Sequence, residues 1–177
     1  SFDDEFYENK FSEISNSLSQ GIDTIFSGNI DQINFTKAHN DVEYYCRFKS
    51  SKILYDDFIM PKLLVIINNF VDALSEPGLD VFKMAEMIKS FEESLSNLRK
   101  IILYLDRTYI FANRINGFLS IIDIVHNSFR KILLEQINDE DHRIDIPTLQ
   151  LIVIQIKLQI DLIRCSEGKS HDDNQDL

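Results

Sequence analysis

The stretch Ile-Ile-Leu-Tyr-Leu-Asp-Arg-Thr-Tyr-Ile, residues 101–110, decides the fold class of this 177-residue chain. It closes a series of apolar residues spaced alternately three and four positions apart, as on one face of a helix. A helix with such a face must bury it against other helices, so the series predicts a long helix inside a bundle, with Leu95 and Leu98 fully buried. We call this series the seam, and its members are Val81, Met84, Ile88, Phe91, Leu95, Leu98, Ile102, Leu105 and Tyr109.

A second stripe of side chains accompanies the seam only at this end of the helix. A helix that packs on one side needs a single apolar stripe. Two interpretations therefore stay open: the bundle closes over both faces here, or the second face meets another protein. The members of the second stripe are Ile101, Tyr104, Thr108 and Phe111, with Arg107 beside them.

The composition favours an all-α protein. Helix-breaking residues are scarce, with 5 Gly and 3 Pro, whereas 44% of the residues are hydrophobic and 13 are Phe. The net charge of -11 argues against a protein that binds nucleic-acid phosphates, because such a protein needs a basic face. The acidity suits a soluble protein.

The sequence gives no sign of secretion or of membrane insertion. We expect no secretory leader, and no membrane-spanning segment, since polar residues interrupt the longest apolar run, Leu149–Ile163. Cys46 and Cys165 occupy helical positions without a motif around them. We interpret both as reduced thiols of an intracellular protein.

The first part of the chain predicts two helices. Residues 1–5 are expected to form a loose acidic start, and the first helix should end at Gly28-Asn29. Asp31 is the expected N-cap of a second helix that runs to about Phe48. The first helix carries Phe11, Ile14, Leu18, Ile22 and Ile25 at helical spacing.

The second helix has two distinguishable faces. One face is expected to enter the core, and the other is mixed in character. The core face comprises Phe35, Ala38, Val42 and Tyr45, and the mixed face comprises Ile33, Thr36, His39, Asn40 and Glu43.

Proline divides the third helical region, at about 51–74. Because proline removes a helical hydrogen bond, Pro61 predicts a kink, or a short helix that ends near Met60. The elements expected after it are a turn at 75–78, a long helix at about 80–112, a turn at 113–117 and a fifth helix from 118 to about 133.

The last predicted helix begins near Asp145, with Pro147 in its first turn. Leu149–Ile163 is apolar nearly all round, whereas the terminal helix of a complete protein should keep one wet face. We therefore expect this helix to pack against a missing part, and the chain to self-associate or expose a patch there. The polar tail at 166–177 is expected to be disordered.

No cluster of side chains predicts a catalytic, metal or cofactor site. The charged loop expected at 138–141 lacks the alternating ligands and central glycine of a calcium loop. Asp106-Arg107 is the charged pair of most interest, as a partner contact or as an ordinary pair on a helix surface. The histidines lie in separate segments without metal-ligand spacing; they are His39, His126, His142 and His171.

Three segments resemble, in order and spacing, the N-terminal repeat of cullins, the scaffold subunits of multisubunit ubiquitin ligases. Leu-Asp-Arg-Thr-Tyr at 105–109 carries the strongest resemblance, followed by 33–46, which ends in Val-Glu-Tyr-Tyr-Cys, and 132–149, which contains Ile144-Asp145. The resemblance covers roughly 11–163 and implies an all-α, antiparallel bundle of five to six helices. It divides the chain into a flexible acidic lead at 1–10, a first cullin repeat at 11–147, the first helix of the next repeat at 148–165 and a disordered tail at 166–177.

The segment 105–109 is most similar to the cullin 4 branch, which includes the budding-yeast relative active in replication-coupled DNA repair. This resemblance implies a non-catalytic scaffold fragment of a nuclear and cytoplasmic cullin-RING ubiquitin ligase. Its implied partner is a β-propeller substrate adaptor, with a POZ-fold adaptor as the alternative. The RING subunit would bind only through the C-terminal half of the family, which this chain lacks. No cofactor, direct nucleic-acid contact or membrane contact is expected.

Carried over by position, the resemblance implies an adaptor surface on the second helix and the end of the long helix. We expect Tyr104 and Arg107 to contribute most of its binding energy. Many cullins have an aromatic residue at the position of His39, within a Glu-Leu-Tyr triplet, whereas this sequence has Lys37-Ala38-His39. This difference concerns which adaptor binds rather than where the adaptor binds. The implied surface residues are Ile33, Thr36, His39, Asn40, Glu43, Tyr104, Arg107 and Thr108.

Two other functions stay open from the sequence. A helical-repeat tethering or transport subunit would share the same bundle periodicity. An all-α enzyme would need a polar cluster, which the sequence does not contain. Recovery of a propeller adaptor in a pull-down would favour the scaffold, whereas vesicle-tethering partners would favour the second function.

Overall fold

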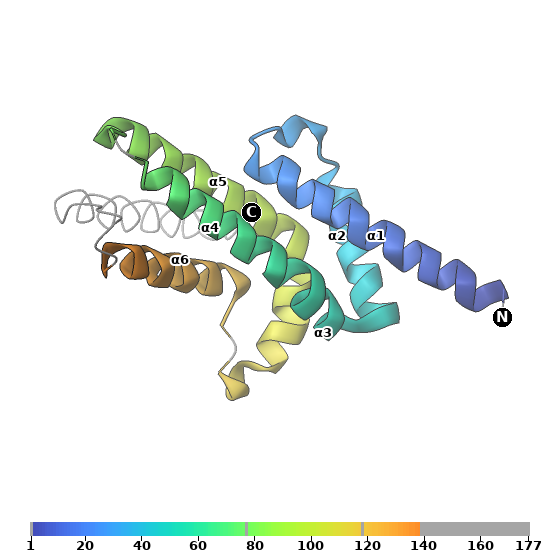
Figure 1. The fold of residues 1–177 in the computed structure, drawn as a ribbon. Helices are drawn as coiled ribbons and strands as arrows, with labels where there is room; N and C mark the ends of the chain where they lie inside the picture. The colour runs from blue at the N-terminus through green and yellow to red at the C-terminus, as the bar shows by residue number, and fades with distance from the viewer. Residues whose placement is uncertain (1, 77, 118, 139–177) are drawn as a thin grey trace, which may run out of the picture.

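The computed structural model describes residues 2–76, 78–117 and 119–138, and every regular element within these residues is helical (Figure 1). The predicted all-α bundle is therefore confirmed. The loop expected at 138–141 lies outside the described residues except for Asn138, which is the last residue of a helix instead. The helix expected at 148–165 and the tail at 166–177 lie outside the described residues entirely.

The first helix, α1 (Phe2–Phe26), begins earlier than the sequence predicts. The loose start expected at 1–5 is wrong, and residues 2–10, assigned to a flexible lead, are the first turns of this helix. Carboxylates near a helix N-terminus interact favourably with the helix dipole, which explains why the acidic start is helical. Farther along, Glu8 Oε1 lies 2.5 Å from Lys49 Nζ, so an ion pair ties this half of α1 to the next helical segment.

The buried face of α1 is the one that its spacing predicts. The helix ends at Phe26, and Gly28 follows with a φ of +82°, a conformation that glycine adopts without steric cost. The predicted end at Gly28-Asn29 is confirmed. The buried residues of α1 include Phe11, Ile14, Leu18, Ile22 and Ile25.

The second helix, α2 (Phe35–Tyr45), begins at a different N-cap from the predicted Asp31. Asp31 lies in a short 3-10 turn, η1 (Ile30–Gln32). Ile33 is extended, with φ -103° and ψ 127°, so the backbone becomes continuously helical only after Asn34. Asn34 Oδ1 accepts a hydrogen bond at 2.9 Å from the backbone N–H of residue 37, which makes Asn34 the cap.

The chain changes direction at Ser50. After α2 it continues as a π-helical turn, η2 (Cys46–Ser50), so the second helical segment ends close to the predicted Phe48. Ser50 itself is extended, and its Oγ accepts a hydrogen bond from Ile53 N at 3.2 Å. This serine therefore ends one helical segment and caps the next.

Pro61 shapes the third helical region. The proline lies in the first turn of its helix, where the missing N–H costs nothing. Just before it, Met60 N donates to Tyr55 O five residues back, the wide spacing of a π turn. The backbone stays helical through Ile59 and Met60, so the structure shows a change from π to α geometry here rather than the end of a helix. The region comprises α3 (Ser51–Ile53), the π-helical turn η3 (Leu54–Ile59) and α4 (Met60–Leu74).

The turn predicted at 75–78 leads into the long helix α5 (Val81–Leu105). Gly78 has a φ of +83°, and Asp80 Oδ1 accepts a hydrogen bond from Lys83 N at 2.9 Å. Asp80 therefore caps α5. Leu95 is 1% exposed and Leu98 is 0% exposed, so their predicted burial is confirmed.

The seam is predicted correctly only as far as Leu105. There the helix enters a π-helical turn, η4 (Asp106–Ile110), in which hydrogen bonds span five residues instead of four. The next buried residue is Ile110, which is 2% exposed, whereas Tyr109 is only half-buried. Tyr109 still packs, half-buried, against the core, but the fully buried position comes one residue later because the extra residue rotates the following side chains by about 100° around the helix.

The residues of the second stripe differ in their exposure to solvent. Ile101 is fully buried, so the bundle closes over this part. Tyr104 is half-buried, Thr108 is exposed and Phe111 is 63% exposed. Closure of the bundle over both faces therefore holds for Ile101 only, and the rest of the stripe stays at least partly accessible to solvent.

The last described helix, α6 (Ile121–Asn138), begins later than the predicted residue 118. Gly117, with a φ of +83°, ends the short 3-10 turn η5 (Arg114–Asn116). Ser120 Oγ then accepts a hydrogen bond from Asp123 N at 3.1 Å, and Asp106 Oδ1 accepts one from Ile121 N at 3.1 Å. These two acceptors satisfy N–H groups that a helix start leaves free, so α6 begins at Ile121.

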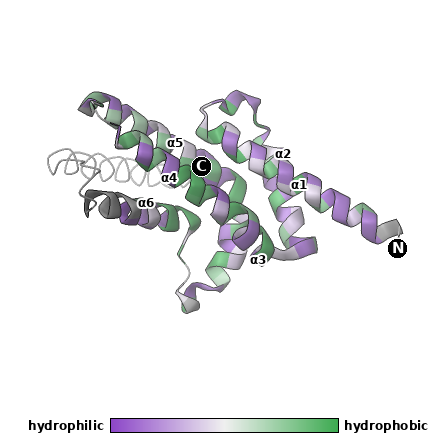
Figure 2. Cartoon of the chain, in the orientation of Figure 1, coloured by the Kyte–Doolittle hydropathy of each residue, from purple (hydrophilic) through white to green (hydrophobic). Residues whose placement is uncertain are grey.

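Aromatic rings join four helices in what we call the aromatic cluster, made of Phe26, Phe70, Phe91 and Phe129. Phe91 of α5 stacks on Phe70 of α4, with ring centroids 4.1 Å apart. Phe26 of α1 lies 5.5 Å from Phe91, and Phe129 of α6 lies 5.6 Å from Phe70. Figure 2 shows hydrophobic and hydrophilic residues along the same helices, as expected for amphipathic helices that bury one face.

The helices are arranged with α5 at the centre of the contacts. In Figure 1, α4 and α5 run in opposite directions, and the first turns of α1 project beyond the other helices. The helix α2 packs on α5 and on α1, and α6 packs on α4. Because α2 and α6 pack on different helices, the end of α5 borders one surface toward α2 and another toward α6.

Candidate protein-interaction surface

Two segments that are distant in sequence meet where α2 packs on α5. His39 Nδ1 lies 3.2 Å from Lys100 O, and because a carbonyl only accepts, this nitrogen donates. Arg47 Nε donates a hydrogen bond to Tyr104 Oη at 3.2 Å. The outer face of α2 and the end of α5 therefore form one continuous surface, which we call the α2–α5 surface.

Arg47 is a central residue of this surface that the sequence reasoning missed. Its guanidinium lies 2.7 Å from Glu43 Oε1 and 5.6 Å from the centre of the Tyr104 ring. The hydrogen bond to Tyr104 and the charge of Glu43 raise the pKa of Arg47. The available signal was its position one helical turn after Glu43, on the same face.

The residues expected on the mixed face of α2 lie at different depths. Thr36 and Asn40 are exposed, whereas His39 and Glu43 are half-buried. Ile33 precedes α2 and packs partly buried against the core, so the expectation that it lies off the core is wrong. An extended residue at that point directs its side chain inward, which helical spacing does not predict.

An aromatic pair adjoins the exposed part of α2. The rings of Tyr44 and Phe48 lie 4.7 Å apart, and Phe48 is 64% exposed. Lys10 Nζ lies 3.9 Å from the centre of the Tyr44 ring, which brings α1 to the same edge. These aromatic residues give the α2–α5 surface apolar area that Ile33 was expected to supply.

The end of α5 divides its predicted site residues between two surfaces. Thr108 Oγ1 donates to Tyr104 O at 2.7 Å, next to the hydroxyl that contacts α2. Arg107 is exposed and lines a groove toward α6, together with Phe111. The structure therefore brings Tyr104 together with the α2 residues but places Arg107 at the opposite border.

Asp106 holds the start of α6 in place from within η4. Its carboxylate accepts the hydrogen bond from Ile121 N, and burial raises its pKa above the ordinary value of 3.8. The hydrogen bond from Ile121 and the nearby Arg99 oppose this rise. The Asp106-Arg107 pair singled out in the sequence thus consists of one helix cap and one exposed cation.

The described residues offer little for catalysis. Within them, no three His, Cys, Asp or Glu side chains gather closely enough to hold a metal ion. Cys46 is a free thiol whose pKa is raised by burial, so it is a poor nucleophile at neutral pH. No helix in the described part of the chain is long and apolar enough to cross a membrane.

The comparisons with known proteins give one match. A family model described as the cullin alpha solenoid domain matches residues 15–174. Neither the comparison with curated proteins nor the comparison with solved structures finds a match to this chain. The matched residues include all of α2, α5 and α6, and α1 from residue 15 onward.

Proposed function

We propose, since this chain belongs to the cullin family, that it is a non-catalytic scaffold segment of a cullin-RING ubiquitin ligase and binds a substrate-adaptor protein. Cullin domains are of a scaffold type that is generally non-catalytic. Family membership therefore favours the scaffold function over a tethering subunit or an all-α enzyme.

The α2–α5 surface carries this proposal. A specific protein interface commonly has an apolar centre and a polar rim. Here the rings of Tyr44, Phe48 and Tyr104 supply apolar area, and Asn40 and Arg47 supply exposed polar groups. Aromatic and arginine residues are also those that most often dominate binding energies.

The similarity of 105–109 to the cullin 4 branch favours a β-propeller adaptor over a POZ-fold adaptor. Both adaptor classes would use the same surface in the family. We further propose that the RING subunit binds the C-terminal half of the complete scaffold, and that the complex acts in nucleus and cytoplasm. Cell fractionation that recovers the tagged protein from neither compartment would contradict the location.

Asn40→Arg tests the adaptor surface without disturbing the fold. Asn40 is exposed in the middle of α2, and arginine has the higher helix propensity, so the variant should fold normally. A long charged side chain at the centre of an interface should raise the Kd for a purified propeller adaptor about 30-fold, or ~2 kcal/mol. Titration calorimetry measures the change.

Asn69→Arg is the matched control, because Asn69 is also exposed in a helix but lies on α4. This variant should bind the adaptor with unchanged affinity. Equal affinities for both variants would reject the α2–α5 surface. Binding of a POZ-fold adaptor with the same sensitivity to Asn40→Arg would keep the surface and replace the adaptor class.

A further inference from the structure

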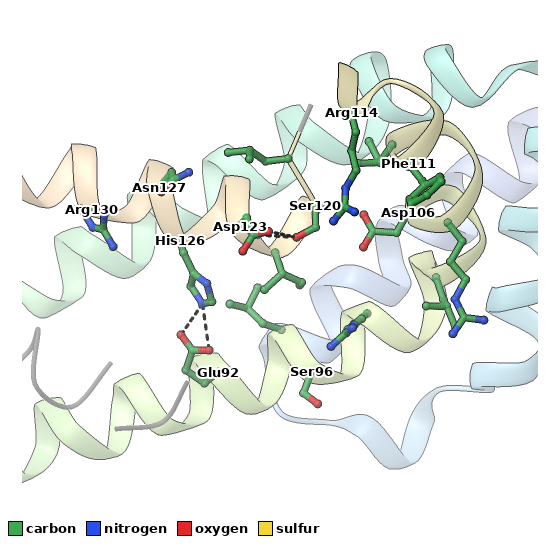
Figure 3. A pocket seen from close by; sticks show the side chains of 17 residues that line it. Glu92, Ser96, Asp106, Phe111, Arg114, Ser120, Asp123, His126, Asn127 and Arg130 are labelled. Carbon is green, nitrogen blue, oxygen red and sulfur yellow. Dashed lines mark hydrogen bonds and ion pairs between the residues drawn. The ribbon is translucent and has the colours of Figure 1, made fainter. Parts of the chain in front are cut away.

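A groove of about 660 Å³ runs between the end of α5 and the start of α6 (Figure 3). Its α5 side includes Ser96 and Asp106, and its α6 side includes Asp123 and Asn127. The aromatic and aliphatic residues of the lining include Leu103, Ile110, Phe111, Leu119 and Ile122. The groove is therefore mixed, with apolar walls and charged borders.

The groove gathers positive charge from a chain whose net charge is -11. The four arginines that line it come from α5, η4, η5 and α6, so four separate elements contribute one each. If arginines served only to keep an acidic surface soluble, they would be spread over that surface rather than gathered at one groove. The described residues contain the arginines Arg47, Arg99, Arg107, Arg114 and Arg130, and all but Arg47 line the groove.

The acidic side chains of the groove already have partners. Glu92 is 5% exposed, and its Oε1 lies 3.0 Å from His126 Nε2. Asp123 Oδ2 accepts a hydrogen bond from Ser120 Oγ at 2.7 Å. The carboxylate of Asp106 accepts the hydrogen bond from Ile121 N at the start of α6.

The cations of the groove are less engaged. Within the described residues, Arg107, Arg114 and Arg130 form no ion pair with a carboxylate within 4.0 Å. Arg114 lies 5.4 Å from the centre of the Phe111 ring, and Phe111 is 63% exposed. These guanidinium groups can donate hydrogen bonds to the carboxylates of another molecule, and the exposed ring beside them offers an apolar contact.

We propose that this groove binds an acidic peptide segment of a partner protein that also carries an apolar side chain. Figure 3 shows Arg130 at the left of the view and Arg114 well to its right, with His126 between them, a separation that suits an extended chain rather than one small anion. A nucleic acid would carry its repeating phosphate charges past the groove over the acidic remainder of the molecule, whereas a short acidic segment can keep its carboxylates within the groove. The site lies beyond the α2–α5 surface, with Arg107 at the border between them.

Selection of random peptides on the whole chain tests the proposal. Peptides that bind should be enriched in Asp and Glu and contain an aromatic or aliphatic residue. Arg114→Gln with Arg130→Gln should weaken binding of a synthesised selected peptide at least about tenfold, and binding should weaken as salt is added. Lys83→Gln with Lys89→Gln removes the same charge from exposed positions of α5 outside the groove and should leave binding unchanged.

Any of four results would overturn the proposal. Selected peptides without acidic enrichment, or with equal affinity for both double variants, would remove the groove as their site. Displacement of the peptide by inorganic phosphate or single-stranded RNA at lower concentration than by a second acidic peptide would assign a different ligand chemistry. Tighter peptide binding after Asp172, Asp173 and Asp176 are changed to Asn would identify the occupant as the chain's own tail.

Discussion

Asp106 shows how a single residue can hold two successive helices together. It belongs to the stretch 101–110, yet its carboxylate serves the first N–H of α6. A helix start that loses such an acceptor leaves its N–H groups to water. The family resemblance at 105–109 therefore includes a residue with a clear role in the fold, independent of any partner.

Replacing Asp106 with alanine should lower the free energy of unfolding by about 1 kcal/mol, the usual effect of losing a cap. Asp106→Asn keeps an acceptor oxygen and removes a buried charge, so it should lose less at pH 7. Urea unfolding of the three proteins measures the difference. An asparagine variant as unstable as the alanine variant would mean that the cap is not the main contribution.

The difference in unfolding free energy between the wild type and Asp106→Asn should depend on pH. Because burial raises the pKa of Asp106 above 3.8, the folded protein holds this proton more tightly than the unfolded chain does. The stability from this group is fully present below pH 3.8 and is lost as the pH rises through the raised pKa. Asp106→Asn should therefore gain stability relative to the wild type over that rise, and a pH series of urea unfolding should detect it. A constant difference at all pH values would contradict the raised pKa.

At the scale of elements, the spacing of apolar residues predicts α5 correctly until the geometry of the helix changes. Three-and-four spacing assumes an α-helix, so it identifies the buried residues from Met84 to Leu105 but gives Tyr109 rather than Ile110 as the next one, after η4 begins. Residue type alone also does not separate Asp31 from Asn34, which are both good caps. The extended backbone at Ile33 decides between them, and the sequence pattern does not contain that information.

Leu95→Ala should lower the free energy of unfolding by roughly 2–5 kcal/mol, because this leucine is fully buried in the seam. Leu64→Ala is the control, since Leu64 is 40% exposed on α4 and should lose much less. Thermal and urea unfolding of both variants give the values. A Leu95 variant no less stable than the Leu64 variant would contradict the seam.

The candidate site was accessible from sequence only in part. The family resemblance pointed to α2 and the end of α5, but no spacing rule relates residues that lie on two different helices. Arg47, Tyr44 and Phe48 become visible as neighbours of the site only once α2 is packed. Arg107 was assigned to the same surface as Tyr104, and the side chain lines the groove instead.

At the scale of the whole molecule, the aromatic cluster makes the described helices depend on one another. Phe91→Ala should destabilise the protein by about 3–5 kcal/mol, and unfolding should remain a single transition, because the ring contacts α1 and α4 together. Phe82→Ala, on the same helix but 84% exposed, is the control and should change little. Differential scanning calorimetry measures both. Separate transitions in the Phe91 variant would show that the helices unfold independently.

The three π-helical turns η2, η3 and η4 have a consequence for how the molecule moves. Tyr55 of η3 lies 5.8 Å from Tyr109 of η4, so two of these turns are in contact. Backbone hydrogen bonds that depart from the regular α pattern open to solvent more readily than those of a long packed helix. Amide hydrogens at 46–50 and 106–110 should consequently exchange with heavy water before those of the seam. An adaptor that binds the α2–α5 surface would then reduce the backbone motion of these turns. The loss of conformational entropy would offset part of its binding free energy.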